Sequence, residues 1–65
     1  MDEDDIRDKL AEVTEEHRDL DEAIRSMLEN AAHDQLRLQR MKKRKLLLKD
    51  VIARLEDMLF PDIIA

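Results

Sequence analysis

The sequence predicts an all-α protein, an antiparallel two-helix hairpin, and three observations point to this fold. Glycine is absent, Pro61 is the only proline, and Phe60 is the only aromatic residue among the 65. Ala, Leu, Glu, Lys, Arg, Gln and Met dominate the chain, and these residues enter a helix at the lowest cost in free energy. Apolar residues recur in steps of three and four along two stretches that mirror each other. We expect a coiled-coil-like hairpin that assembles further into a helical bundle.

The two stretches form a seam along which the helices are expected to pack. It consists of Ile6, Leu10, Val13, His17, Leu20, Ile24 and Met27 in the first stretch, and Leu38, Met41, Lys45, Leu48, Ile52, Leu55 and Leu59 in the second. Twelve of the fourteen positions are apolar, and His17 and Lys45 are the exceptions. When the chain folds back, the numbers of opposite residues add up to 65, so His17 meets Leu48 and Leu20 meets Lys45. Every seam residue then has a partner in the same layer.

The first helix is expected over residues 4–29 of a single domain, 1–65. Four acidic residues precede it or open it, and anions stabilise a helix N-terminus. Asp4 or Asp5 is the predicted N-cap.

The turn is expected over residues 30–34 and the second helix over residues 35–60. Asn30 is a residue that tolerates the left-handed conformation in which many helices end. Asp34 is a favourable N-cap for the second helix. Pro61 lacks a backbone N–H and stops that helix near Leu59 or Phe60, leaving a short apolar tail over 61–65.

One alternative architecture has the same seam. The heptad frame continues through the turn, with Ala31 and Asp34 on seam positions. One long helix, paired with a second copy in an antiparallel coiled-coil dimer, would therefore form equivalent layers. We favour the hairpin because a buried layer of Asp34 residues would be costly.

Charge is divided unequally between the two helices. Residues 1–35 carry a net charge of −9 and residues 36–65 carry +4, which together give −5. Folding back is expected to place acids of the first helix, Asp19, Asp21 and Glu22, near cations of the second, Lys42, Arg44 and Lys45. Within the helices, the expected ion pairs at a spacing of four residues are Asp5–Lys9, Asp21–Arg25 and Asp50–Arg54.

A second apolar stripe beside the seam is the candidate interaction face. It consists of Leu36, Leu47, Val51 and Met58. One partner helix cannot bury both the seam and this stripe, so a second copy or another protein is expected to cover the stripe. The expected partners are a homo-oligomer, a dimer first of all, or a protein partner. The leading hypothesis is therefore a non-enzymatic protein that acts through self-association or protein–protein interaction.

The basic segment 42–49 supports an alternative hypothesis, a small RNA- or DNA-binding regulator. Its contacts would be Lys42, Lys43, Arg44 and Lys49. The acidic balance of the chain and its lack of aromatic residues for base stacking count against nucleic acid as a partner. A solvated helix face whose cations pair with the first helix is the simpler interpretation.

Neither catalysis nor a cofactor or metal is expected. Thr14 and Ser26 are the only hydroxyl residues, cysteine and glycine are absent, and only two histidines are present. His17 and Lys45 are interpreted as polar seam positions that fix how the helices align. No run of apolar residues is long enough to span a membrane, and we expect a cytoplasmic protein.

Two motifs resemble those of a known family. The H-x-x-L-D element stands at His17 to Asp21, and the L-K-K-x-K-L-x-L-K-D element at Met41 to Asp50, with Met41 in place of the usual leucine. Together they resemble the YdcH-like family of short bacterial proteins of uncharacterised function. The resemblance implies a bacterial, cytoplasmic helical hairpin and brings no catalytic residues.

Overall fold

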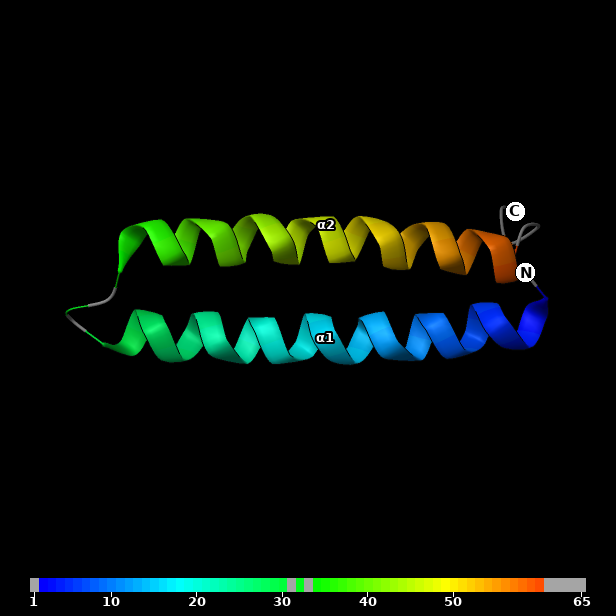
Figure 1. The fold of residues 1–65 in the computed structure, drawn as a ribbon, viewed down its shortest axis with the longest axis horizontal. Coiled ribbons are helices and arrows are strands. Elements are labelled where there is room, and N and C mark those ends of the chain that lie inside the picture. The colour runs from blue at the N-terminus through cyan, green and yellow to red at the C-terminus, as the bar shows by residue number, and fades with distance from the viewer. Residues whose placement is uncertain (1, 31, 33, 61–65) are drawn as a thin grey trace.

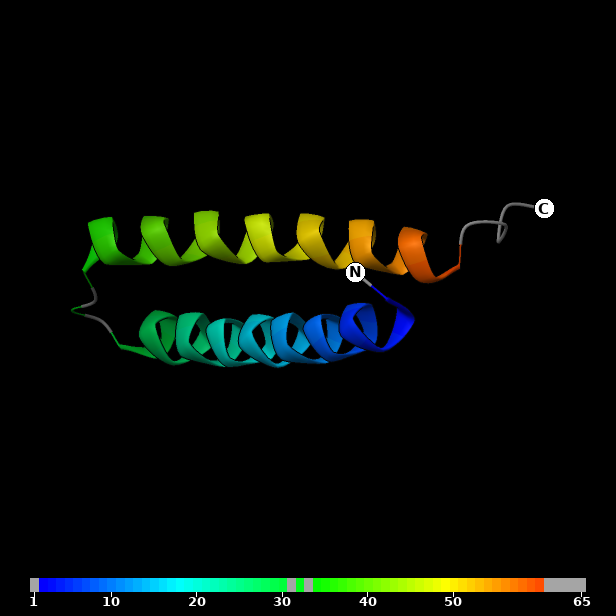
Figure 2. The same cartoon turned by 45° about the vertical axis from the view of Figure 1, so that its right-hand side comes forward.

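The protein is a hairpin of two antiparallel helices, as the seam predicts. The structure, a computed structural model, describes residues 2–30, 32 and 34–60. Helix α1 spans Glu3–Glu29 and helix α2 spans Gln35–Leu59. They lie side by side over their whole length, with the turn at one end and both outer helix ends at the other (Figures 1 and 2). The alternative of one long helix is not the fold of this chain.

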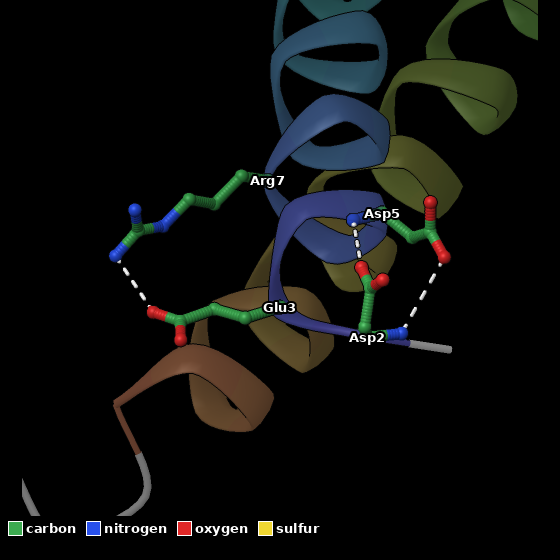
Figure 3. Close-up of polar contacts among 4 residues, drawn as sticks. All are labelled: Asp2, Glu3, Asp5 and Arg7. Carbon is green, nitrogen blue, oxygen red and sulfur yellow. Dashed lines mark hydrogen bonds and ion pairs between the residues drawn. The ribbon is translucent and has the colours of Figure 1, made fainter.

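The N-terminus of α1 is closed by a reciprocal capping box. Asp2 is the N-cap: the Asp5 backbone N–H donates to its carboxylate at 2.9 Å, and the Asp2 N–H donates to the Asp5 carboxylate at 3.4 Å (Figure 3). Because two free helix donors find acceptors here, the helix begins at Glu3, slightly earlier than expected. The prediction that Asp4 or Asp5 is the N-cap is wrong, since Asp5 takes the third helical position instead.

The turn is formed without a left-handed residue in its described part. Asn30 ends α1 in an extended conformation, with φ −93° and ψ 120°, so the left-handed conformation predicted for it is wrong. Its side-chain oxygen accepts a hydrogen bond from the backbone N–H of Ala32 at 3.1 Å, a local bond that turns the chain. Asp34 caps α2, as predicted, by accepting from the N–H groups of Leu36 at 3.0 Å and Arg37 at 3.3 Å.

Helix α2 ends at Leu59, close to the end predicted from Pro61. Phe60 is the C-cap, and its backbone N–H still donates to the Glu56 carbonyl at 2.8 Å. The residue before a proline is disfavoured in a helical conformation, which explains the end point. The predicted apolar tail, 61–65, lies outside the described residues.

The core is narrow and consists of seam residues. Six of them are buried: Ile6, Val13, Ile24, Leu38, Leu48 and Leu55. The other eight seam positions, His17 and Lys45 included, are half-buried. Two helices enclose their contact line from two sides only, so this is the degree of burial that a lone hairpin can reach.

Candidate functional site

Polar contacts between the helices fix their alignment near the middle of the hairpin. The Lys45 ammonium lies 2.5 Å from the Asp21 carboxylate, and the Arg44 guanidinium lies 3.0 Å from that of Glu16. Asp21 follows Leu20, the predicted layer partner of Lys45, so this ion pair agrees with the mirrored seam. An unpaired cation in the seam would be costly. Lys45 avoids this cost because its ammonium group pairs with the Asp21 carboxylate.

Asp21 is the carboxylate most affected by these contacts. The hydrogen bond from Lys45 and the charge of that ammonium lower the pKa of Asp21 below its ordinary value, and Arg25 adds to the effect. Arg25 itself lies 3.5 Å from Asp21 across one helical turn, and this pair was predicted. Asp21 therefore holds two cations, one from each helix.

Some of the expected ion pairs form and others do not. Asp50 and Arg54 pair at 3.4 Å, as predicted. The Asp5–Lys9 pair does not form, because the Asp5 carboxylate accepts a hydrogen bond from the backbone N–H of Asp2 and Lys9 lies 3.9 Å from Glu12. Of the acids expected opposite the cations of α2, Asp19 and Glu22 make no such pair, and Glu16 takes this place. Glu16 lies nearer the groove between the helices than they do and is half-buried, whereas both others are exposed.

His17 is the one seam residue with an unsatisfied polar atom. Its Nε2 atom is buried and has no hydrogen-bond partner. The ring as a whole is half-buried, between the buried positions Val13 and Ile24 along α1. An unpaired polar atom in this place lowers stability and contributes no binding group that solvent can reach.

The predicted apolar stripe divides into exposed and packed members. Leu36, Leu47 and Met58 are exposed, with 66%, 52% and 54% of their surface accessible. Val51 is half-buried and packs against the core cluster of Ile6, Val13, Leu48 and Leu55. Three side chains of the stripe are therefore exposed to solvent, while Val51 belongs to the edge of the core.

A large hollow lies on the side of α2 that faces away from α1. We call this surface the outer face of α2 and define it as Lys43, Leu46, Leu47, Asp50 and Ala53. All five are exposed, and at 100° per residue they occupy the side of the helix opposite the seam. An open hollow of about 820 Å³ is lined by them together with Arg44 and Lys49. Leu46 is the most exposed large apolar residue here, at 69%.

Sequence reasoning missed most of the outer face. Leu47 was predicted as an interaction residue, but Leu46 and Asp50 were not. The signal was present, because Lys43, Leu46, Leu47 and Asp50 follow each other in steps of three, one and three, which places them on one side of a helix.

A second, smaller hollow lies along the flank of the hairpin. It has a volume of about 320 Å³ and is lined by His17, Ile24, Lys42, Lys45, Leu46 and Lys49. Of the predicted nucleic-acid contacts, it brings Lys42 and Lys49 together, whereas Lys43 lies on the outer face and Arg44 is bound to Glu16. Lys42, Lys43 and Lys49 form no ion pair with another described residue.

Two classes of site have no support in the described part of the chain. No group of three or more His, Cys, Asp or Glu residues there could hold a metal ion. Neither of the two helices is long and apolar enough to cross a membrane.

The comparisons with known proteins identify the family. A family model described as a protein of unknown function (DUF465) matches residues 10–56, which include both motifs. The chain belongs to this family, the YdcH-like small proteins. The matched part of this YdcH-like chain covers most of the seam, both ion pairs between the helices and the outer face of α2. No curated protein and no solved structure matched the chain.

Proposed function

We propose that the YdcH-like chain is a non-enzymatic interaction module that binds another protein surface through the outer face of α2. The observation that carries this proposal is the distribution of exposed apolar side chains. Five of the six large ones among the described residues belong to α2 or its C-cap: Leu36, Leu46, Leu47, Met58 and Phe60. Only Leu28, beside the turn, belongs to α1.

This distribution has no explanation in the stability of the hairpin itself. The exposed leucines are not members of the core cluster, and exposed apolar surface that is gathered on one side of a soluble protein commonly marks a contact surface. Helix α1, by contrast, presents charged residues on its outer side. The two helices thus have different roles: α1 completes the core and keeps the chain acidic, and α2 provides the contact.

Site-directed photocrosslinking in the native cell tests this role. A photoreactive amino acid replaces Leu47 on the outer face in one variant and Glu15, an exposed residue of α1, in the control. We expect crosslinked protein products from position 47 and none from position 15. Equal products from both positions, or none from position 47, would contradict the proposal.

Leu47 is a better test position than Val51. Because Val51 packs against the core, a Val51→Glu variant would disturb the hairpin as well as any interface. Leu47 lies outside the core cluster and is about half exposed, so a change there leaves the seam intact.

The flank hollow favours one second candidate, a small RNA- or DNA-binding regulator. Lys42 and Lys49 line that hollow without an acidic partner, which leaves two cations free for phosphate groups. Binding of a labelled single-stranded oligonucleotide, followed by fluorescence anisotropy at several salt concentrations, separates the two candidates. Binding that weakens steeply with salt and is lost in a Lys42→Ala, Lys49→Ala variant would support this second function. Absence of binding at low salt would exclude it.

A further inference from the structure

We infer that a second copy of the chain covers the outer face of α2, in an antiparallel pair of α2 helices whose two-fold axis passes between Leu46 and Leu47. This inference rests on the proposed function and names the partner of the same surface. It follows from the order of charged and apolar residues on that surface, which is complementary to itself.

Along the helix, the outer face presents a cation, Lys43, then two leucines, then an anion, Asp50. In an antiparallel pair with this axis, the numbers of opposite residues add up to 93, so Lys43 lies opposite the partner's Asp50 and Leu46 opposite the partner's Leu47. Lys43 and Asp50 are seven residues apart and therefore point in nearly the same direction from the helix. Each pair of chains would thus form two Lys43–Asp50 ion pairs around a contact of four leucines.

The residues that face each other in this arrangement are those that line the large hollow. Lys43, Leu46, Leu47 and Asp50 all line it, and both leucines are more than half exposed in the single chain. A second copy would remove these leucines from water and give Lys43, which has no ion pair among the described residues, an acidic partner. Arg44 and the partner's Lys49 are like charges whose numbers also add up to 93, and both line the hollow, but Arg44 already pairs with Glu16 in its own chain.

The acidic α1 helices do not prevent this association. Because the outer face is turned away from α1, the four helices would lie in the order α1, α2, α2 and α1. Packed helix axes are 8–10 Å apart, so the two α1 helices would be separated by roughly 25–30 Å. That distance is several times the screening length of about 8 Å at physiological salt, so their mutual repulsion is weak.

Charge-swapped variants test both the partner and its alignment. Sedimentation equilibrium is measured for chain concentrations from about 10 µM to about 1 mM, the range in which a small interface associates. We expect the wild-type chain to dimerise. Lys43→Asp and Asp50→Lys should each weaken the dimer about tenfold or more, because like charges then face each other at two places, one on either side of the axis. The double variant should return to within about threefold of wild type.

Two control variants separate the interface from the fold. Lys42→Asp reverses an exposed charge that does not line the large hollow and should change dimerisation far less than Lys43→Asp. Leu46→Glu should abolish the dimer while its helix content, measured by circular dichroism, equals that of wild type.

Three outcomes would overturn the inference. They are a wild-type chain that stays monomeric throughout the concentration range, single charge swaps without effect, and a double variant that does not recover. A monomeric chain that still crosslinks to a different protein from position 47 would overturn the second copy and leave the interaction role standing. A dimer that the swaps affect as expected, without crosslinks to any other protein, would support the second copy as the partner.

Discussion

Replacing His17 with leucine should stabilise the hairpin, because this histidine is the one imperfect residue on the α1 half of the seam. Its Nε2 atom is buried without a hydrogen-bond partner. Leaving a buried polar atom unsatisfied costs about 1–3 kcal/mol. Leucine of similar size removes that cost and adds apolar contact in a layer whose expected partner, Leu48, is only 3% exposed.

The size of the gain follows from the burial of the ring. Since His17 is only half-buried, the lower part of that range applies, and we expect the free energy of unfolding to rise by about 1–2 kcal/mol. For a domain of this size, each kcal/mol corresponds to a shift of roughly 4–8 °C in the melting temperature. The His17→Leu chain should therefore melt about 5–15 °C higher than wild type.

Thermal and urea unfolding followed by circular dichroism measure this gain. All chains are compared at one concentration, because self-association raises the apparent stability. Arg18→Leu is the matched control: it introduces the same residue at the neighbouring exposed position and should change stability by less than about 0.5 kcal/mol. The reasoning fails when His17→Leu gives no increase, or when the control gives an equal one.

Three further perturbations probe the rest of the hairpin. Leu48→Ala removes a side chain that is 3% exposed and should cost about 2–4 kcal/mol, enough to unfold most of a domain this small at 37 °C as seen by loss of helix content. Asp34→Ala removes the acceptor for two N–H groups and should cost about 1 kcal/mol in urea unfolding, whereas Asp34→Asn should keep most of that stability. Asp21→Asn should lower the melting temperature slightly at pH 7, and 1 M salt should remove most of the difference. Because the pKa of Asp21 is lowered in the folded chain, its contribution is present above the ordinary carboxyl pKa of about 4 and is lost as the pH falls through the folded value, so the two chains should become equally stable in acid.

Much of the fold follows from the periodicity of the sequence. The seam predicts both helices, their antiparallel arrangement and the alignment seen in the Lys45–Asp21 pair. All fourteen seam positions are buried or half-buried. Burial of the seam stabilises the hairpin over the whole length of both helices. The fold therefore follows from these fourteen positions, although the turn is only weakly marked in the sequence.

The predictions that failed depend on individual hydrogen bonds. Four acidic residues, three of them aspartates, precede Ile6, and any of these aspartates can cap a helix, so the choice of Asp2 rests on the reciprocal bond with Asp5. The conformation of Asn30 likewise depends on its own side-chain contact with Ala32. Alternatives of this kind differ by amounts of free energy that residue types alone cannot rank.

The candidate site overlaps the predicted apolar stripe at one residue, Leu47. Sequence reasoning predicted Leu36, Leu47 and Met58 as interaction residues, and all three side chains are exposed. It also predicted Val51 as an interaction residue, whereas this valine packs against the core cluster. Val51 lies on the side of α2 where the core ends and the exposed surface begins. Where such a border falls depends on how α1 sits against α2, and the helical period does not define this.

The placement of both outer helix ends at one end of the hairpin has a mechanical consequence (Figure 1). Force that pulls Glu3 and Leu59 apart acts across the helix axes, so it opens the seam one layer at a time from that end. Each step breaks few contacts, whereas pulling along the axes would have to break all layers together. We therefore expect the hairpin to yield to small forces when stretched by its ends, and to separate last at Ile24 and Leu38, the buried seam residues nearest the turn.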